Sequence, residues 1–271
     1  MGTTFRLIIT GASDGFLNMA IDEALGQSFQ ESGFRKYAGF VRFYGWSCAW
    51  LSCGYFQDPR KIIDENKMQQ AGVSLVRRLS GGGLVLHNDE VTYSIMCFDQ
   101  ILKPRRVRES YFQLTAFVRD ALRHLGLETH FAYERGAFLS SAFSHICAYG
   151  KEKGDIVVAG KKIGGHAQRR KKHFIFQQGF IPLGKGGYAL NHFVQEEYKD
   201  KEKQEIASLA EFIEIDAESL RQLLQECLRQ NLGVDLDERP LTAEEEERAR
   251  FLAKNKYSTY GWNYCRETKL P

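Results

Sequence analysis

The chain has 271 residues, of which 43% are hydrophobic and 26% charged, and its formal net charge is +3. This composition is typical of a folded globular protein and excludes a disordered or fibrous chain. No apolar stretch approaches the ~20 residues needed to span a bilayer, and the run Leu7-Ile8-Ile9 is too brief for a signal peptide. We therefore expect a cytoplasmic protein that does not interact with a membrane.

Six cysteines are spread along the chain without CxxC pairs or a CxxC…HxxxH grouping. This spacing indicates neither a zinc site nor a disulfide scaffold, so we expect no metal, and free thiols in a reducing compartment. The small net charge does not indicate a nucleic-acid partner, and none is expected. The basic residues gathered between Lys161 and Lys172 suit an acidic partner or a phosphate group instead.

The N-terminal half of the chain alternates between helical and strand patterns. Met19, Ala20 and Ala24 have helical spacing behind Asp14, a plausible N-cap, and predict a helix over residues 15–31. Aromatic and β-branched runs bounded by glycine and serine predict strands. The expected strands cover 40–44, 50–54, 74–78, 84–87 and 91–97, with a helical interval over 59–71 and an amphipathic helix over 107–125.

In the C-terminal half, two strands are predicted over 155–159 and 173–176, around a glycine-rich turn. From Leu209 onward the pattern is helical, and Thr242 opens the last helix with a capping box. Strands interleaved with helices, followed by helices, predict an α/β or α+β fold with a mixed β-sheet flanked by helices. We expect a main domain over 1–205 and a small helical C-terminal segment over 206–271 packed on it.

The strongest local signal runs from Arg77 through Arg78, Ser80 and three consecutive glycines to His87. Each glycine costs ~1 kcal/mol relative to alanine in a regular element, so three together indicate close approach of another group to the backbone. Their N–H groups can hold an anionic or carbonyl oxygen, with Arg77 or Arg78 adding charge. The alternative is a flexible hairpin tip with solvated arginines, and a single histidine is structural as often as functional.

A second signal is the segment Gly160-Lys-Lys-Ile-Gly-Gly-His-Ala-Gln-Arg169. Adjacent side chains of a strand face opposite sides, so at most one of Lys161 and Lys162 points into a given cleft. A lysine beside a Gly-Gly turn can polarise a carbonyl or hold a carboxylate. The alternative is a charged hairpin exposed to solvent.

Cys147 lies in Ser144-His-Ile-Cys-Ala-Tyr149, within a stretch of small polar residues that reads as a loop. Most free cysteines are buried and inert. A loop thiol near a lysine and a glycine-rich backbone, however, has the lowered pKa that makes the thiolate available at neutral pH. His145 shares a face with Cys147 on an extended segment and is a candidate to assist it.

In this order, these stretches resemble the lipoate-protein ligase and octanoyltransferase family, which shares a fold with biotin-protein ligases. Asn18-Met-Ala-Ile-Asp-Glu-Ala resembles the family's opening helix, and Arg77-Arg-x-Ser-Gly-Gly-Gly-x-x-x-His87 its acyl-pocket signature. Lys162-Ile-Gly-Gly-x-Ala-Gln168 resembles its catalytic-lysine turn. The resemblance implies a biotin/lipoate-protein ligase fold of the class II aminoacyl-tRNA synthetase type, with residues 1–205 as the catalytic domain.

Within this family, ligases activate free lipoate with ATP, whereas transferases take octanoyl from acyl carrier protein through a cysteine thioester. Cys147 lies fifteen residues before Lys162, which is similar to the cysteine-dependent octanoyltransferases. The resemblance thus implies Cys147 and Lys162 as catalytic residues. The substrate-binding residues that it implies are Arg77, Arg78, Ser80, Gly81, Gly82, Gly83, His87, Gly164, Gly165, Ala167 and Gln168.

The expected reaction is transfer of octanoyl from acyl carrier protein to a lysine of a lipoyl-acceptor protein, such as glycine cleavage H protein or a lipoyl domain. N–H groups around Gly164 and Gly165, with Lys162, are candidates to stabilise the oxyanion, and Lys162 is the expected proton acceptor. No cofactor is required in this scheme. The first alternative is a lipoate-protein ligase that needs ATP and Mg²⁺, and the second is a non-catalytic acyl-binding protein.

Overall fold

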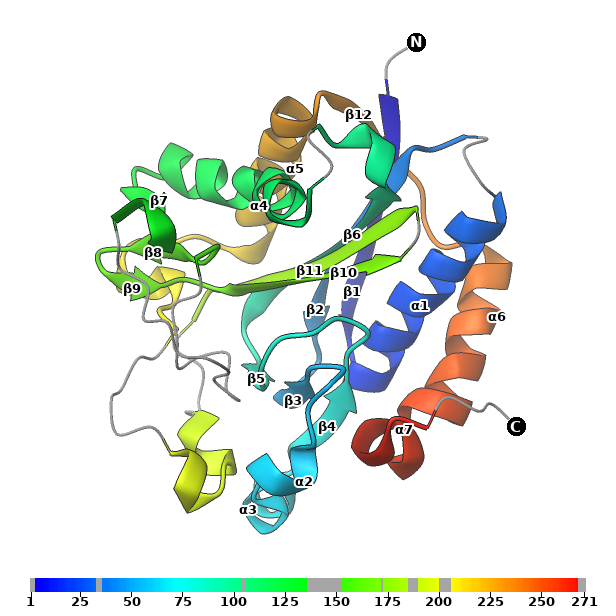
Figure 1. Cartoon of the computed structure of the whole chain (residues 1–271), viewed down its shortest axis with the longest axis vertical. Helices are drawn as coiled ribbons and strands as arrows, with labels where there is room; N and C mark the ends of the chain where they lie inside the picture. Colours follow the sequence, from blue (N-terminus) through cyan, green and yellow to red (C-terminus); the bar gives the residue numbers. More distant parts are fainter. Residues whose placement is uncertain are drawn as a thin grey trace.

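The computed structural model describes residues 3–32, 36–103, 106–135, 153–171, 173–184, 190–199 and 206–267. A six-stranded mixed sheet, in the order β10-β11-β6-β2-β1-β12, runs through the middle of the molecule (Figure 1). β1 pairs in parallel with β2 and β12, and the remaining neighbours are antiparallel. The six strands are β1 (Thr3–Ser13), β2 (Gly39–Trp46), β6 (Glu90–Phe98), β10 (Gly165–Lys171), β11 (Phe174–Pro182) and β12 (Val234–Glu238).

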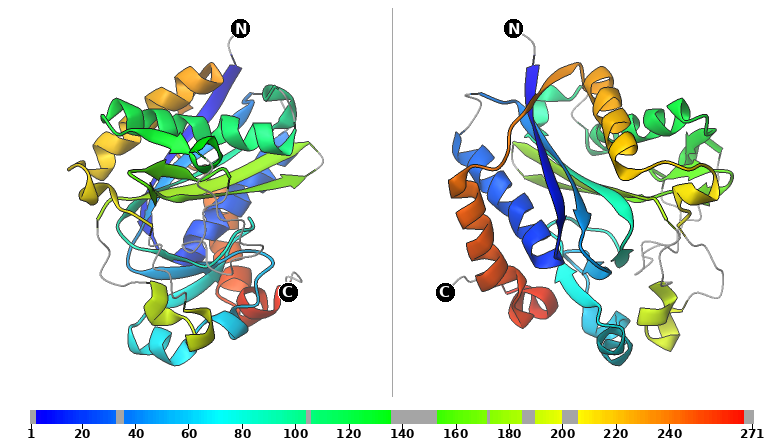
Figure 2. Two further views of the ribbon diagram at one scale, coloured as in Figure 1. Left: turned by 60° about the vertical axis from the view of Figure 1, so that its left-hand side comes forward. Right: turned by 180° about the vertical axis from the view of Figure 1, so that it is seen from behind.

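Helices cover both faces of this sheet (Figure 2). α1 (Gly15–Ser32) and α6 (Ala243–Leu252) pack together on one face, and α4 (Val107–His124) and α5 (Ala217–Leu232) on the other. Asp14 caps α1 as predicted, since its Oδ1 accepts a hydrogen bond from the backbone N–H of Leu17 at 2.9 Å. The sequence prediction of a mixed sheet flanked by helices is therefore confirmed.

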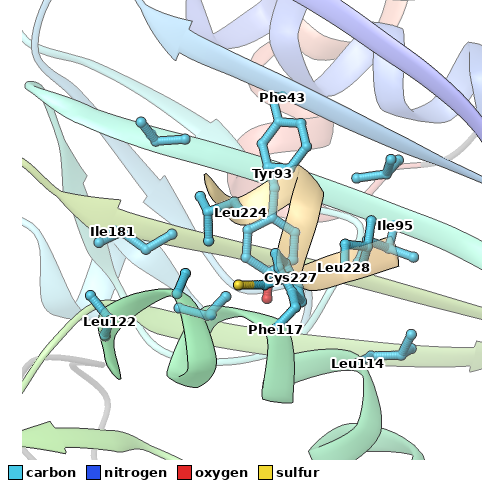
Figure 3. Packing of buried hydrophobic residues seen from close by; sticks show 14 of the residues in the cluster. Phe43, Tyr93, Ile95, Leu114, Phe117, Leu122, Ile181, Leu224, Cys227 and Leu228 are labelled. Atoms are coloured by element: carbon cyan, nitrogen blue, oxygen red, sulfur yellow. The ribbon is translucent and has the colours of Figure 1, made fainter. Parts of the chain in front are cut away.

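The largest core cluster lies between the sheet and the pair α4 and α5. Figure 3 shows how side chains of these helices meet those of β6 and β11. The apolar positions of α4 recur every three or four residues and so form one stripe toward the sheet. The buried side chains at this contact include Tyr93, Ile95, Leu114, Phe117, Leu122, Ile181, Leu224, Cys227 and Leu228.

A second, three-stranded sheet has the order β4-β3-β5. β3 (Trp50–Cys53) lies in the middle, parallel to β4 (Ser74–Arg77) and antiparallel to β5 (Val85–His87). The glycines 81–83 consequently connect the two outer strands and do not form the tip of a hairpin, which corrects the simplest interpretation of the sequence. The helical interval predicted over 59–71 consists of two short helices, α2 (Pro59–Ile62) and α3 (Glu65–Gln70).

A third small sheet positions the lysine turn. β8 (Ile156–Val158) pairs with β7 (Thr129–Phe131) on one side and with β9 (Lys161–Lys162) on the other. Ala159 and Gly160 connect β8 to β9 with φ values of 47° and 81°. This left-handed pair gives the tight turn that brings β9 back beside β8.

Three strands of the central sheet were not predicted, namely β1, β10 and β12. The C-terminal segment contains the predicted helices α5 and α6. It also contains a short helix that was not predicted, α7 (Tyr260–Cys265), and it contributes β12 to the main sheet. The boundary expected at residue 205 falls outside the described residues and stays a prediction. In the part of the chain that the structure describes, no helix is both long and apolar enough to cross a membrane.

Candidate active site

A cavity of about 430 Å³ lies between α1, the small β4-β3-β5 sheet and the β10-β11-β6 part of the central sheet. Apolar and aromatic side chains form much of its wall: Met19, Tyr44, Trp46, Val85, Ala167 and Phe180. Among the residues that the sequence predicted to bind substrate, Arg78, Ser80, Gly82, His87, Gly165 and Ala167 line it.

Strand register explains why this cavity forms on the α1 face. Phe180 of β11 lies opposite Gly165 of β10 and Thr92 of β6, and Gln178 lies opposite Ala167 and Ser94. Because alternate residues of a strand share a face, Phe180 and Gln178 both point toward α1. The small residues of β10 leave space beside them, so the cavity has a floor of β11 side chains.

Arg78 organises the glycine segment rather than lying free in solvent. Its guanidinium donates hydrogen bonds to the carbonyl oxygens of Gly81 and Gly83, at 3.0 and 2.8 Å, and to that of Ser52 at 2.8 Å. Gly82 has φ +88°, a conformation that favours glycine. A Cβ on Gly82 would lie 3.3 Å from Arg78 and 3.7 Å from the Ala167 side chain. The segment is therefore folded against the cavity wall.

His87 belongs to a buried hydrogen-bonded chain. Its Nε2 lies 2.6 Å from Ser52 Oγ and its Nδ1 lies 2.8 Å from Glu90 Oε1. The imidazole also stacks on the Trp46 ring, with centroids 4.0 Å apart. These contacts hold His87 in one orientation at the cavity wall.

Lys162 and Asp155 form a buried ion pair. Lys162 Nζ lies 2.9 Å from Asp155 Oδ2, and the two residues are 5% and 3% exposed. The neighbouring Lys161 points the other way, since its side chain is 58% exposed and pairs with Glu211 at 2.6 Å. This confirms the prediction that only one of the two lysines is turned inward. Gly165, three residues after Lys162, begins the cavity lining.

Gly164 forms the turn between Lys162 and the cavity. Its φ is +72°, and a Cβ there would lie 2.2 Å from the carbonyl oxygen of Phe180. No larger residue fits this backbone approach without movement of β11. The first glycine of the Gly-Gly pair, which suggested a functional turn, thus has a direct steric reason.

His166 is among the residues that line the cavity, but its imidazole contacts Tyr93 on the opposite face of β10. On the paired strands, Gly179 of β11 lies opposite His166 of β10 on one side and opposite Tyr93 of β6 on the other. Across this glycine, Nδ1 of His166 lies 3.0 Å from the Tyr93 hydroxyl. A Cβ on Gly179 would meet His166 Nδ1 at 2.4 Å, so this glycine makes the contact possible. Burial, assisted by the nearby Lys162 cation, lowers the pKa of His166 to about 3. The imidazole is neutral at physiological pH.

Five predicted binding residues are not part of the cavity lining. Gly81, Gly83 and Gly164 belong to the segments beside it, whereas the side chains of Arg77 and Gln168 make their contacts elsewhere. Arg77 is fully buried and donates to main-chain carbonyl oxygens of two distant segments. One segment follows β3, and the other is α7, where Asn263 accepts at 2.6 Å. Gln168 is on the α4 face, where its Nε2 donates to Gln177 Oε1 at 3.1 Å. The carbonyl contacts of Arg77 tie α7 to the small sheet.

The predicted nucleophile, Cys147, lies outside the described residues, as does His145. Burial raises the thiol pKa of three of the described cysteines. The pKa of Cys53 is raised, the pKa of Cys97 is raised to about 12, and the pKa of Cys227 is raised to about 11. The thiolate is the nucleophilic form, so these three buried thiols are poorly suited to attack a thioester.

Sequence reasoning missed most of the apolar cavity wall. Tyr44 and Trp46 alternate on β2, and Gln178 and Phe180 alternate on β11. A period of two marks one face of a strand, but it does not reveal which face borders an open space. The sequence did contain one indication of the cavity, namely Gln178, because it is a polar residue at an inward position of an apolar strand.

Solved structures show the same fold. An archaeal bi-partite lipoate protein ligase from Thermoplasma acidophilum superposes with a TM-score of 0.81 and 24% identity, covering 98% of each chain. Lipoate-protein ligase A bound with ATP superposes with a TM-score of 0.80 and 24% identity, covering 97% of this chain and 99% of that chain. The predicted lipoate-protein ligase fold is therefore confirmed.

The sequence comparisons identify the family. The lipoyl protein ligase A/B catalytic domain model matches residues 14–230. Octanoyltransferase LipM of Bacillus subtilis (strain 168) is 32% identical, covering 97% of this chain and 99% of that protein. Octanoyltransferase LipM of Geobacillus kaustophilus is 33% identical, covering 97% of this chain and 98% of that protein. This chain belongs to the lipoyl protein ligase A/B catalytic domain family.

Proposed function

We propose that this protein is an octanoyltransferase of protein lipoylation. It takes octanoyl from acyl carrier protein and transfers it to a lysine of a lipoyl-acceptor protein, such as glycine cleavage H protein or a lipoyl domain. The observation that carries the proposal is the largely apolar cavity that begins at Gly165, next to the turn that follows Lys162. Its wall suits an unbranched acyl chain, and the near-full-length relatives named octanoyltransferase support the choice of reaction.

In the first step, the Cys147 thiolate attacks the carbonyl carbon of the carrier thioester. The oxygen of the tetrahedral intermediate then carries negative charge, and the Lys162 ammonium with the N–H groups of Gly164 and Gly165 stabilises it. A donor of this kind commonly contributes about 3–4 kcal/mol. The carrier thiolate leaves and takes up a proton, so that octanoyl remains on Cys147 as a new thioester.

In the second step, the neutral ε-amine of the acceptor lysine attacks the acyl-cysteine. An amide bond forms, the Cys147 thiolate leaves, and the amine loses one proton. An ammonium cannot accept that proton, so Lys162 acts as acceptor only after it has passed a proton to Asp155, 2.9 Å away. The scheme balances without ATP or a metal ion, and it gives ping-pong kinetics.

The alternative is a ligase that activates a free acid with ATP. The two structural neighbours above are ligases, but at 24% identity they indicate the shared fold and do not distinguish the two reactions. The two activities differ in their required donor, which gives a direct test.

The test supplies the purified protein with octanoyl carrier protein and an apo acceptor domain, without ATP, and measures the octanoylated acceptor by mass spectrometry. We expect complete transfer and no pyrophosphate. If the acceptor is modified only when free octanoate and ATP are present, the protein is a ligase. If neither donor modifies any acceptor although octanoate binds, the protein is an acyl-binding protein.

A further inference from the structure

A second cavity, of about 610 Å³, continues on the same face of the sheet. It lies over the residues that follow along the paired strands β10, β11 and β6. Arg169, Phe176 and Met96 lie side by side on these strands, and Lys171 pairs with Phe174 two residues further on. Phe174, Phe176, Met96 and Leu79 give it an apolar floor. Among the residues that the structure describes, none lines both cavities.

One row of polar side chains separates the two cavities. Ser80 Oγ donates to Gln178 Oε1 at 2.8 Å, and Gln178 Nε2 donates to Asp22 Oδ2 at 2.7 Å. Ser80 and Gln178 line the first cavity, whereas Asp22 lines the second. The hydrogen bond from Gln178 to Asp22 therefore crosses from one cavity to the other.

This row is held firmly in place. Gln178 is 6% exposed, Ser80 0% and Asp22 1%. Asp22 also accepts from the Arg42 guanidinium and from Ser94 Oγ, each at 2.8 Å. Movement of Gln178 would leave buried polar groups without partners, which is unfavourable. The separation is thus a fixed wall rather than a loose contact between flexible side chains.

The orientation of an acyl chain follows from the proposed function, on which this inference rests. The carbonyl carbon lies at the Lys162–Gly165 end, so the methyl end points along the strand rows toward Gln178. We infer that Gln178 is a specificity-determining residue: with Ser80 and Asp22 it closes the first cavity and limits the acyl group to a medium chain length. A longer chain reaches the apolar floor beyond only by displacing this polar wall.

The experiment compares wild type with Gln178→Ala and Gln178→Leu. Acyl carrier proteins loaded with 8-, 10-, 12- and 14-carbon chains are used at equal concentration with one acceptor. We expect wild type to prefer 8 carbons, and Gln178→Ala to raise transfer of 12- and 14-carbon chains relative to 8 by at least tenfold. Gln178→Leu removes the amide but keeps a side chain of similar size, and it should retain the wild-type length limit. Gln178→Ser opens the same passage and replaces the alanine variant if that variant does not fold.

A second substitution tests whether the added length enters the second cavity. Met96→Trp places a larger side chain on its floor, and in the Gln178→Ala background it should abolish the gain for 12- and 14-carbon chains. Binding of the free fatty acids to the same proteins is measured by calorimetry. Chain-length selection is thereby tested even if transfer requires another donor. An unchanged length preference of Gln178→Ala, in both binding and transfer, would overturn the inference. Absence of transfer by every protein, together with the expected shift in binding, would instead reject the proposed function.

Discussion

Lys162 Nζ lies 2.9 Å from Asp155 Oδ2, and neither side chain is more than 6% exposed. Asp155 directly precedes β8, and Lys162 lies on β9, the second strand of the β8–β9 hairpin. The ion pair therefore links the start of this hairpin to its end. Removal of one partner from such a pair leaves a buried, uncompensated charge and typically costs about 3–5 kcal/mol. A single Lys162 substitution therefore affects folding and catalysis together, and the two effects need separate variants.

Replacement of both partners separates these effects. We expect Lys162→Met with Asp155→Leu to be within about 2 kcal/mol of wild type in stability, because no charge is left unpaired. Octanoyl transfer should fall at least about 100-fold, because an oxyanion donor is lost. Urea unfolding and the transfer assay measure the two quantities. Lys161→Ala, on the same strand but exposed, is the matched control and should retain full activity. Wild-type transfer by the double variant would rule out a catalytic role for Lys162.

Gly81 and Gly82 form a matched pair in the glycine segment. A Cβ on Gly81 would have no atom of the described residues within 4 Å, whereas Gly82 has φ +88° and faces Arg78. We expect Gly82→Ala to cost about 1–2 kcal/mol in backbone strain and to raise KM for the octanoyl carrier. Gly81→Ala should change neither the unfolding free energy nor KM appreciably. Equal effects of the two substitutions would show that the φ of Gly82 is not what requires glycine.

Arg77 should act on stability and not on substrate binding. Its guanidinium donates hydrogen bonds to backbone carbonyl oxygens in the segment after β3 and in α7. Lysine has fewer hydrogen-bond donors, in a different geometry. We expect Arg77→Lys to lower the free energy of unfolding by about 2–4 kcal/mol, while KM for the octanoyl carrier stays unchanged. Arg60→Lys, at an exposed ion pair, should cost less than about 1 kcal/mol. A raised KM with unchanged stability would place Arg77 in the substrate site.

His166 should make stability depend on pH. Burial and the Lys162 cation lower its pKa in the folded protein from 6.5 to about 3. Between these values the unfolded chain binds a proton that the folded protein does not, so stability rises with pH through this window and is fully present above it. Between pH 7 and 5, wild type should lose up to about 1.4 kcal/mol per pH unit more than His166→Gln. Parallel pH profiles in urea unfolding would contradict a buried neutral imidazole.

The sequence indicated most core strands and helices because their apolar residues recur with the period of the element. It missed the interior strand β1, whose apolar run Leu7-Ile8-Ile9 was considered only as part of a signal peptide. It also failed at both edges of the central sheet. β10 and β12 are the outer strands, and their sequences are mostly polar or charged. Among the described residues, one side of each of these strands has no neighbouring strand, and exposed edges favour polar and charged side chains. Polar edge strands lack the alternating pattern on which strand prediction depends.

The site was predictable where the chemistry is local. Alternation along β9 separated Lys161 from Lys162, and the Gly-Gly pair marked a turn whose backbone approaches β11. Arg77 was not predictable in the same way, because its acceptors in α7 follow it by more than 180 residues. The wall at Gln178 likewise depends on Asp22 and Ser80, which only the folded chain brings together.

The most direct test of the account is intact-protein mass spectrometry of the protein mixed with octanoyl carrier protein, without acceptor or ATP. We expect one octanoyl adduct on the wild type, released by hydroxylamine as a thioester, and none on Cys147→Ala. An equal adduct on Cys147→Ala, or no adduct on a wild-type protein that still modifies the acceptor, would contradict transfer through a Cys147 thioester.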